Sequence, residues 1–493
     1  MIDTLSELIS AVYFLAAGGL LLYGLNCYVM VYLFYRKREA AEISRQKVLS
    51  AFENLLLEDD LPMVTTQIPV YNEFNVIERI LRAVCQMVYP KGRHDIQILD
   101  DSTDETCFLI DRVVAELVSA GHGIQVIRRK NREGFKAGAL KVGLEIAKGE
   151  LVTVFDADFI PPPNYLLRTV PFFLTDDNLG LVQTRWGHLN HRKSFLTRAQ
   201  SIGIDGHFMI EQSARNWNGL YMNFNGTAGI WRKSAIIDGG GWQSDTLTED
   251  MDLSYRVQFA GWQTVYLPDV VVPAEIPEDI NAFKSQQFRW AKGSIQTAKK
   301  LFPRLLKARV HLFKKIQAVF HLTHYMVHPL MLTLAILALP VLLTLKMALA
   351  PLLFTVLAVA LGLAMIAPST LYMVSQRAAY TDWYRRILFL PILVAAGVGL
   401  ALSNSRAVFE AMIGRQSAFV RTPKRGDREV KKYRLRSPWM AIFEILLGAY
   451  CIWSLTYYLS SEKYLIGPFL AIYAAGFLFV GFLTLFHSFR WLR

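Results

Sequence analysis

Long apolar runs divide this chain into two kinds of sequence. The first run extends from about Leu8 to Tyr35, with Glu7 before it and Arg36-Lys37-Arg38 after it. It is longer than the core of a signal peptide and has no small-x-small cleavage site, so it predicts a retained transmembrane helix. Further apolar runs lie at about 318–345, 350–374, 387–404, 440–460 and 465–487. Between 36 and 317 no run is long enough to cross a bilayer, which predicts a water-exposed domain.

Within that domain, short β-branched runs alternate with helical patterns. Strands are predicted at Met63–Ile68, Ile96–Leu99, Ile124–Ile127 and Leu151–Phe155, and helices at 75–88, 105–120, 136–147 and 164–174. This alternation is typical of a parallel α/β sheet with crossover helices, in which ligands bind at the carboxyl ends of the strands. The sequence contains neither a Gly-x-Gly-x-x-Gly string nor a Walker loop, which disfavours hydride transfer and P-loop hydrolysis.

A polar cluster follows each of the four predicted strands. The clusters are Pro69-Val70-Tyr71-Asn72-Glu73, Asp100-Asp101-Ser102, Asn131-Arg132-Glu133-Gly134 and Asp156-Ala157-Asp158. Because they would meet at one edge of the sheet, they predict a nucleotide pocket. Asp156 and Asp158, at i and i+2, could face the same side and share Mg²⁺ or Mn²⁺ with a diphosphate. The alternative is a turn in which one of them caps the next helix.

Asp100 and Asp101 have two interpretations. Their carboxylates could accept hydrogen bonds from a nucleobase and from ribose. Alternatively, they could form an Asx-type turn before the helix at 105–120, which Ser102 and Thr103 would also support. The two interpretations are compatible, because caps and ligand contacts share the ends of strands.

A second pair of acids, Glu249 and Asp250, follows the glycine-rich loop at 239–242 and precedes a helical pattern. Asp250 could remove the proton from an acceptor hydroxyl. A single base is sufficient when the leaving group departs from the opposite face of the sugar, so the expected transfer is inverting. The alternative is structural: Thr248 could cap the helix, and acids are common in a first turn.

Gln286, Arg289 and Trp290 form a third cluster, just before the second apolar run. Arginine can bind a diphosphate through its planar fork, and tryptophan offers a flat face to a sugar ring. Trp186 offers a second such face. The alternative interpretation of Arg289 and Trp290 is an anchor at the membrane interface.

The net charge of +12 is unevenly distributed. Residues 405–438 contain ten Arg or Lys against three acids, a net charge of +7. Such a segment beside membrane helices is expected on the cytoplasmic face, near anionic lipid headgroups, and the domain at 37–317 is expected to be cytosolic too. The N-terminus would then lie outside and the C-terminus in the cytosol. The run at 387–404 would be re-entrant, interfacial or folded as a hairpin. No aromatic-interleaved basic motif suggests nucleic acid as a partner.

The cysteines and three histidines of one predicted membrane helix give weaker indications of function. The four cysteines show no paired spacing, so neither disulfides nor a zinc site are expected. His321, His324 and His328 share about one face of a membrane helix, but no carboxylate accompanies them. A buried polar seam is therefore the favoured interpretation, and a metal site the alternative.

Three longer strings resemble the processive family 2 glycosyltransferases, in particular the cellulose-synthase-like glucomannan, mannan and xyloglucan-backbone synthases. They are Gln67-Ile68-Pro69-Val70-Tyr71-Asn72-Glu73, Leu99-Asp100-Asp101-Ser102-Thr103-Asp104 and Asn131-Arg132-Glu133-Gly134-Phe135-Lys136-Ala137-Gly138-Ala139-Leu140. The resemblance implies a Rossmann-like GT-A catalytic domain at 37–317, ending in interfacial helices. It would lie between a transmembrane helix at 1–36 and transmembrane helices at 318–493, with a cytosolic gating-like loop at 415–438.

The resemblance also implies roles for individual residues. Asp250 would be the catalytic base, with Glu249 beside it. The nucleotide would be bound by Pro69, Tyr71, Glu73, Asp100, Asp101, Arg132, Lys136 and Asp156, and the metal by Asp158 with Asp156. The acceptor and diphosphate would contact Gln286, Arg289, Trp290 and Thr227, and the gating loop would contribute Phe419, Arg421, Thr422 and Lys424.

The activity implied is inverting transfer of a hexose, from UDP-glucose or GDP-mannose, to a growing β-linked polysaccharide that is translocated through the membrane. The alternative is a non-processive lipid glycosyltransferase similar to ceramide glucosyltransferases. The metal, base and Gln-x-x-Arg-Trp features are common to both, so the motifs leave the acceptor, glycan or lipid, open.

Overall fold

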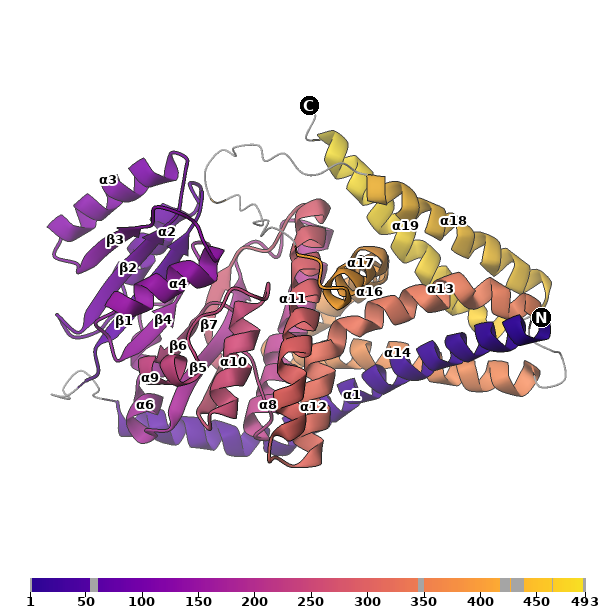
Figure 1. Cartoon of the computed structure of the whole chain (residues 1–493), viewed down its shortest axis with the longest axis horizontal. Helices are drawn as coiled ribbons and strands as arrows, with labels where there is room; N and C mark the ends of the chain where they lie inside the picture. The colour runs from indigo at the N-terminus through magenta and orange to yellow at the C-terminus, as the bar shows by residue number, and fades with distance from the viewer. Residues whose placement is uncertain are drawn as a thin grey trace.

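The computed structural model describes residues 2–53, 61–344, 350–416, 426, 439–462 and 464–490. An α/β domain lies at one end of the molecule and a group of long helices at the other (Figure 1). Helix α1 (Ile2–Ala51) extends from the helical end along the base of the α/β domain, so it links the two parts.

Seven strands form one sheet in the order β3-β2-β1-β4-β6-β5-β7. They are β1 (Val64–Val70), β2 (His94–Asp100), β3 (Ile124–Arg128), β4 (Leu151–Val154), β5 (Leu179–His188), β6 (Gly229–Arg232) and β7 (Gln263–Ala274). The four strands predicted from the sequence are present and pair in parallel, β2 with β3 and β1 with both β2 and β4.

The other half of the sheet, for which no strands were predicted from the sequence, is not parallel throughout. Strand β6 runs antiparallel to both β4 and β5, although β5 and β7 pair in parallel. Strand β6 has four residues, too few to give a periodic signal, and Pro268 interrupts the hydrophobic pattern of β7. The sheet is therefore mixed.

Helices cover both faces of the sheet. They are α2 (Ile77–Cys85), α3 (Thr106–Ser119), α4 (Phe135–Ile146), α5 (Tyr165–Thr169), α6 (Pro171–Thr175), α7 (Phe195–Asp205), η2 (Gly206–Gln212), α8 (Ser213–Trp217), α9 (Lys233–Asp238) and α10 (Glu249–Phe259). The single helix predicted at 164–174 is two short helices. Pro171 starts the second one, because proline lacks the N–H that would continue the first.

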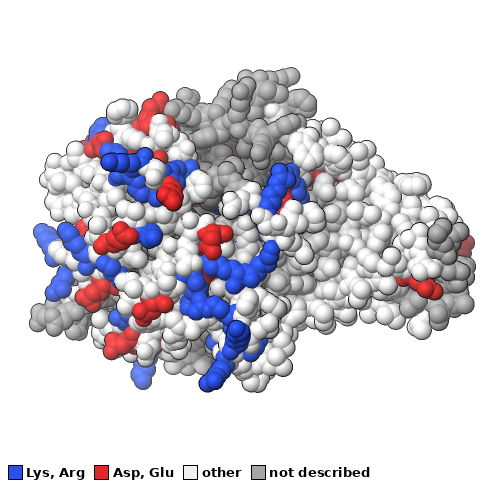
Figure 2. Space-filling model, in the orientation of Figure 1, with Lys and Arg blue, Asp and Glu red and all other residues white. Residues whose placement is uncertain are grey.

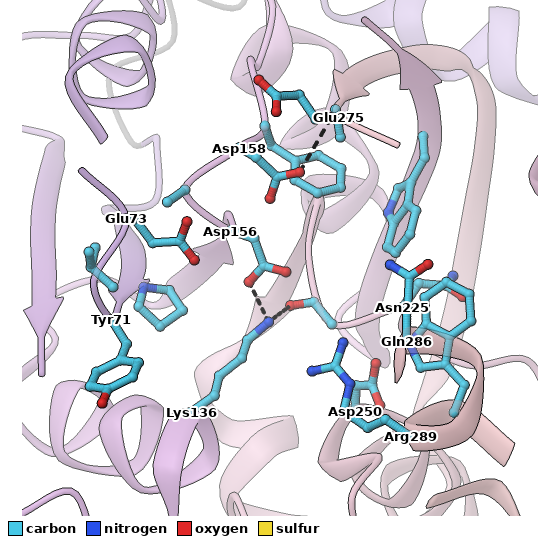
Figure 3. A pocket seen from close by; sticks show the side chains of 18 of the residues that line it. Tyr71, Glu73, Lys136, Asp156, Asp158, Asn225, Asp250, Glu275, Gln286 and Arg289 are labelled. Atoms are coloured by element: carbon cyan, nitrogen blue, oxygen red, sulfur yellow. Dashed lines mark hydrogen bonds and ion pairs between the residues drawn. The ribbon is translucent and has the colours of Figure 1, made fainter. Parts of the chain in front are cut away.

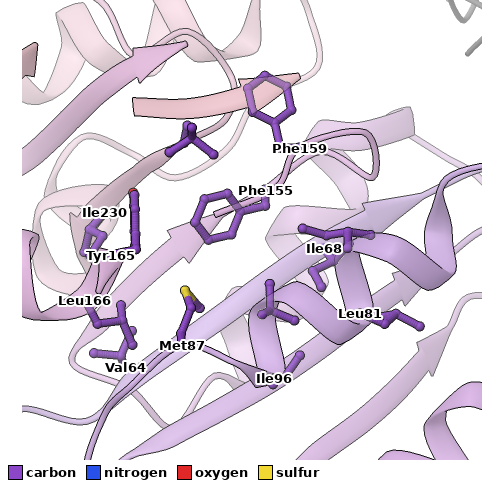
Figure 4. Close-up of a cluster of buried hydrophobic side chains, with 14 of the residues drawn as sticks. Val64, Ile68, Leu81, Met87, Ile96, Phe155, Phe159, Tyr165, Leu166 and Ile230 are labelled. Carbon is purple, nitrogen blue, oxygen red and sulfur yellow. The ribbon is translucent and has the colours of Figure 1, made fainter. Parts of the chain in front are cut away.

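Two apolar clusters hold these layers together. In β4, Leu151 belongs to the cluster under α2, α3 and α5, whereas Val152 and Val154 belong to the cluster under α4, α9 and α10. Figure 4 shows the first cluster, in which Phe155 packs between the strands and Tyr165. Burial on both faces fixes the position of β4, and therefore of the polar residues that follow it.

The remaining helices are longer and more apolar. They are α11 (Ile280–Lys307), α12 (Leu312–Thr323), η3 (His324–Met326), α13 (Val327–Thr344), α14 (Ala350–Ala379), α15 (Trp383–Arg386), η4 (Ile387–Phe389), α16 (Leu390–Gly399), α17 (Ala401–Met412), α18 (Trp439–Ser460), η5 (Tyr464–Ile466) and α19 (Gly467–Arg490). Five helical segments of the described chain are long and apolar enough to cross a membrane: Thr4–Ala51, Leu312–Thr344, Thr355–Ala379, Trp439–Ser460 and Gly467–Ser488. Each overlaps one of the five clearest apolar runs of the sequence.

The sixth apolar run, predicted at 387–404, forms a bent pair. Trp383–Gly399 and Ala401–Met412 meet at 44°. Just before this pair, the Tyr380 hydroxyl donates to Asp205 Oδ1 in the α/β domain at 3.2 Å. At its end, Lys299 Nζ of α11 donates to the Met412 carbonyl at 2.7 Å. Both ends therefore lie beside the α/β domain or its last helix, which supports the re-entrant interpretation.

Helix α1 does not end at the predicted boundary near residue 36. It continues to Ala51 and contacts the α/β domain, where Arg45 Nε lies 3.3 Å from Asp269 Oδ1 and its guanidinium stacks over Trp217. The predicted division between 36 and 37 thus falls inside one continuous helix.

Candidate active site

A cavity opens at the carboxyl ends of β1 and β4, between the α/β domain and α11 (Figure 3). Most residues singled out from the sequence line it. These are Pro69, Tyr71, Glu73, Asp101, Arg132, Lys136, Asp156, Asp158, Trp186, Glu249, Asp250, Gln286, Arg289 and Trp290. The structure thus brings together side chains from the strand ends, from the start of α10 and from one face of α11.

Lys136 occupies the centre of this cavity, in the first turn of α4. Its Nζ donates to Asp156 Oδ1 at 2.5 Å and to the Gly226 carbonyl at 2.8 Å (Figure 3). Burial alone lowers the pKa of Lys136, but the carboxylates of Asp156 and Glu249 outweigh it, so the pKa lies above its ordinary value. Lys136 is therefore a fixed cation where a diphosphate would need one.

Asp158 lies on the same wall as Asp156, next to the end of β7. Its Oδ2 accepts the backbone N–H of Glu275 at 3.3 Å, and the Glu275 carboxylate pairs with Arg79 at 2.9 Å. No group of three or more His, Cys, Asp or Glu side chains in the described chain could hold a metal. Two carboxylates on one wall fit a hard divalent cation if diphosphate oxygens complete its coordination.

Thr227 does not reach the cavity, contrary to its predicted contact with the acceptor. Its side chain is buried, and its Oγ1 accepts the backbone N–H of Asp156 at 2.9 Å. Thr227 follows Gly226 directly and precedes β6, which pairs with β4, so the hydroxyl points into the sheet. Thr227 therefore holds the backbone of Asp156 in place.

Asp100 is also buried away from the cavity, so its predicted contact with the nucleoside is not supported. Its Oδ2 pairs with Arg128 at 2.8 Å, and its Oδ1 accepts the N–H of Ser102, the Asx-type turn that was the alternative interpretation. Asp101 does line the cavity, but Arg129 holds both of its oxygens, at 2.9 and 2.5 Å. Asp101 would therefore meet a ligand as half of an ion pair.

Arg132 and Tyr71 lie together in the lining of the cavity. The Arg132 guanidinium lies 3.3 Å from the centre of the Tyr71 ring. Arg129, which sequence reasoning missed, donates to the carbonyls of Glu133 and Phe135 and so fixes the loop that carries Arg132. Figure 3 shows Tyr71 on the side of the cavity opposite Asp250 and Arg289, and the Arg132 guanidinium lies over the Tyr71 ring.

Asp250 is the second residue of α10, and its half-buried side chain lines the cavity. Burial, and next the negative charge of Glu249, raise the pKa of Asp250 from 3.8 to about 7. The N–H of Met251 and the charges of Lys136 and Arg289 act in the opposite direction. A carboxylate with this pKa binds and releases a proton near neutral pH, as a general base must.

The start of α10 is fixed by α11. Thr248 does not cap α10 through its side chain, which corrects the structural alternative for that residue; its Oγ1 lies 3.1 Å from Thr297 Oγ1 of α11. Gly293 makes this contact possible, because a Cβ there would lie 2.6 Å from Thr248 Cγ2 and 2.9 Å from its backbone nitrogen. One turn earlier, Arg289 enters the cavity beside Asp250 (Figure 3).

The predicted gating residues Phe419, Arg421, Thr422 and Lys424 lie outside the described residues. Gly426, in the same basic segment, is described. Its backbone N–H donates to Glu275 Oε2 at 3.2 Å, so at this residue the segment contacts the wall of the cavity.

Sequence reasoning missed His188 and Glu275, two polar residues of the cavity lining. Asn225, which the resemblance placed with Gly226 and Thr227 near the acceptor end, does line the cavity. Glu275 follows β7 and precedes a Pro277 turn, a polar strand end of the kind that identified the other clusters. His188 gave no such signal, because β5, which ends at this residue, was not predicted from the sequence.

His321, His324 and His328 take part in a seam of polar contacts, one of the arrangements expected from the sequence. His321 contacts Tyr255 and Asn223, at 2.8 and 3.0 Å, and His328 contacts Asn404 at 2.9 Å. His324 binds back to the carbonyl of His321. Each histidine thus has a hydrogen-bond partner of its own.

Comparison with known proteins gives one family. The model described as "Glycosyltransferase like family 2" matches residues 62–293. A probable glucomannan 4-β-mannosyltransferase 7 of Oryza sativa subsp. japonica is 42% identical over 266 residues, 53% of this chain and 46% of that protein. A glucomannan 4-β-mannosyltransferase 7 of Arabidopsis thaliana is 33% identical over 456 residues, 86% of this chain and 79% of that protein. The first relatives are matched over about half of their length.

A solved structure shares the fold. A mannosyltransferase from Pyrobaculum calidifontis, in complex with GDP-mannose and Mn²⁺, aligns with a TM-score of 0.51 at 18% identity, covering 79% of this chain and 99% of that one. Together with the family match, this confirms the GT-A prediction for the α/β domain.

Proposed function

This chain belongs to the family 2 glycosyltransferases, and we propose that it transfers a mannosyl residue from a nucleotide sugar to the end of a β-linked glycan. The observation that carries the proposal is the position of Asp250. It is a carboxyl group with a pKa of about 7 in a cavity that also contains Asp156, Asp158, Lys136 and Arg289. The choice of mannose rests on the relatives, which are named glucomannan 4-β-mannosyltransferases.

The transfer is a single displacement. Asp250 takes the proton of an acceptor hydroxyl as its oxygen forms a bond to the anomeric carbon. The bond from that carbon to the diphosphate breaks, and the diphosphate leaves with the electron pair from the opposite face. One base is sufficient, so the anomeric configuration is inverted. Asp250 is suited to this role because its raised pKa makes it a stronger proton acceptor than an exposed aspartate.

The leaving diphosphate is stabilised by fixed cations. Lys136 and Arg289 approach the cavity from opposite sides, and both are close enough to Asp250 and Asp156 for their charges to interact. A divalent cation, when bound, would be held by Asp156 and Asp158 with diphosphate oxygens and would neutralise negative charge on the leaving group. Lys136, now paired with Asp156, is placed to pair with the diphosphate instead.

The acceptor is proposed to lie against α11. Gln286, Arg289 and Trp290 follow at i, i+3 and i+4, so they share one face of the helix. Trp290 and Trp186 offer flat faces for sugar rings on that side of the cavity. The apolar helices beside α11 are proposed to embed the protein in a membrane and to pass the growing glycan across it.

The test is a donor panel. The purified full chain is incubated with GDP-mannose, GDP-glucose, UDP-glucose and UDP-GlcNAc, with Mn²⁺ or Mg²⁺ and a β-1,4-linked mannotetraose acceptor. Products are analysed by mass, linkage and anomeric configuration. We expect β-1,4-linked mannose from GDP-mannose. An α-linked product would contradict the single-displacement mechanism. Transfer from UDP-sugars alone would contradict the proposal that the donor is GDP-mannose.

The variant Asp250→Asn tests whether Asp250 is the base. An amide cannot accept the proton, so transfer should fall by about 10²–10⁴. Binding of GDP should persist, because Asp250 carries no proposed contact with the nucleotide. Transfer within a few-fold of wild type would remove Asp250 from the mechanism.

A further inference from the structure

Asn225 is held on the cavity wall by side chains that the transfer mechanism does not use. His207 Nε2 lies 2.9 Å from Asn225 Oδ1, and His207 Nδ1 lies 2.9 Å from Glu211 Oε2. Asn223 Nδ2 donates to the same Asn225 oxygen at 3.0 Å. We propose that this relay fixes the Asn225 amide as a hydrogen-bond donor to a hydroxyl oxygen of the acceptor's terminal sugar. The inference rests on the proposed function and names a determinant of acceptor binding.

A backbone carbonyl determines how the side-chain amides of Asn223 and Asn225 are oriented. Asn223 Nδ2 donates to the Phe224 carbonyl at 3.2 Å, and a carbonyl can only accept. The nitrogen of Asn223 is therefore the atom that faces Asn225, so Asn225 must present its oxygen there. Its nitrogen is then the atom that remains for the cavity, apart from a long 3.5 Å contact with the Asn223 carbonyl.

His207 has an acceptor on each side. Asn225 Oδ1 and the Glu211 carboxylate oxygen both accept hydrogen bonds, so the His207 nitrogen that faces Asn225 is placed to donate to it. Burial alone raises the pKa of Glu211, but its contact with His207 outweighs burial and lowers the pKa to about 2. His207 is thus held between Glu211 and Asn225.

Asn225 is placed close to the base. Its backbone N–H donates to Gln183 Oε1 at 3.0 Å, which fixes the start of the turn. The next residue, Gly226, has φ +80°, and a Cβ there would lie 3.0 Å from Asp250 Oδ2. In Figure 3, Asn225 lies toward Gln286 and away from Tyr71, on the acceptor side of the cavity.

A second branch ties this orientation to the helix of the base. Asn223 Oδ1 lies 3.0 Å from His321 Nε2, and His321 Nδ1 lies 2.8 Å from the Tyr255 hydroxyl. Tyr255 belongs to α10, which begins with Glu249 and Asp250. The amide of Asn225 and the base are thus held by one connected set of buried side chains.

The experiment measures acceptor and donor constants separately, with β-1,4-linked mannotetraose as the acceptor and GDP-mannose as the donor. Asn225→Ala and His207→Ala should each raise the acceptor KM by about tenfold, the value of one hydrogen bond. The donor KM and the affinity for GDP should stay at the wild-type value. His207→Gln should recover part of the loss, because its amide can still donate to Asn225 Oδ1. Glu211→Gln should give a smaller rise in the same direction.

His122→Gln is the matched control, because His122 lies in the turn before β3 and outside the cavity lining. It should leave both constants unchanged. If Asn225→Ala keeps the acceptor KM within about twofold of wild type, or changes only the donor KM, the inference is overturned. If His207→Ala has no effect while Asn225→Ala does, the relay is overturned. A wild type that transfers no sugar to mannotetraose would overturn the proposed function itself, which distinguishes the two failures.

Discussion

At the scale of single residues, the partners of each carboxylate decide what it can do. Asp101 is neutralised by Arg129 and Asp156 by Lys136, both through short ion pairs. Asp250 instead lies beside another carboxylate, Glu249, in a half-buried position. Acids in one site are commonly assigned their roles by such differences in environment. Asp250 is therefore the group suited to proton transfer, and the paired aspartates to fixed positions around the donor.

The raised pKa of Asp250 makes a pH prediction. Asp250 accepts a proton only when ionised, so kcat/KM should rise with pH through about 7 and level off above it. Glu249→Gln removes a charge that raises this pKa, so the rising limb should move to lower pH. The measurement is the pH profile of kcat/KM for both forms. If the rising limb of Glu249→Gln lies at the same pH as that of the wild type, or at higher pH, the charge of Glu249 does not raise the pKa of Asp250.

Asp158 makes a prediction about metal. Without its carboxylate, the diphosphate would face the cavity with less compensating charge. Asp158→Ala should abolish Mn²⁺- or Mg²⁺-dependent binding of GDP, measured by calorimetry with and without EDTA. Asp176→Ala, on the loop before β5, is the control. Full transfer in excess EDTA would contradict a metal role altogether.

Sequence reasoning at this scale succeeded where a side chain follows a predictable strand. Tyr71, Asp156 and Asp158 were placed in one cavity because β1 and β4 could be recognised. It failed for Asp100 and Thr227, because a motif gives the residue type and not the direction of the side chain. Whether a carboxylate at a strand end faces a ligand or an arginine such as Arg128 depends on distant packing.

At the scale of elements, α11 determines the acceptor side of the site. Buried ion pairs tie it to its neighbours: Lys284 to Glu444 of α18 at 2.6 Å, and Lys292 to Glu410 of α17 at 2.9 Å. Between these two lysines lie Gln286, Arg289 and Trp290. The two ion pairs thus fix the position of α11 along its axis and its rotation about that axis, and so the direction in which Gln286, Arg289 and Trp290 face.

The Lys284–Glu444 pair makes a stability prediction. Lys284→Met leaves a buried carboxylate without its cation, which costs about 3–5 kcal/mol where such a charge is uncompensated. Changing both residues, Lys284→Met with Glu444→Leu, removes the stranded charge and should recover most of that loss. The measurement is the midpoint of thermal unfolding in detergent. If the double variant is less stable than the single one, the loss of stability in Lys284→Met does not come from the unpaired charge of Glu444.

The elements themselves were predictable only in part. The first four strands and their helices alternate regularly, and burial on both faces leaves a clear apolar signal. Strand β6 is four residues long, and β5 contains a register shift between Thr184 and Arg185. Such short or irregular strands are specified by their neighbours in the sheet and not by their own periodicity.

At the scale of the whole molecule, the contacts of the bent helix pair indicate on which side of the membrane the neighbouring segments lie. The bent pair at 383–412 begins and ends near the α/β domain, and the exposed Arg415 follows it directly. A re-entrant pair keeps Arg415 on the same side as the α/β domain, which agrees with the preference of basic residues for the cytoplasmic side.

Cysteine labelling tests this topology. Single cysteines at Lys307 and Arg415, both exposed, are introduced into a cysteine-free chain. In sealed vesicles of known orientation, a membrane-impermeant maleimide should label both positions from the same side. A cysteine at Glu462, between α18 and α19, should be labelled from the opposite side. Labelling of positions 307 and 415 from opposite sides would show that the bent pair crosses the membrane.

The central claim is that this chain extends a glycan, and the length of its product tests that claim most directly. Purified protein in lipid vesicles is given excess primer and radiolabelled GDP-mannose, and products are resolved by length over time. A site that keeps the acceptor between Trp290 and the base should give long β-mannanase-sensitive chains while most primers stay unextended. A product limited to one hexose on a lipid, at every donor concentration, would contradict the account and identify a lipid glycosyltransferase.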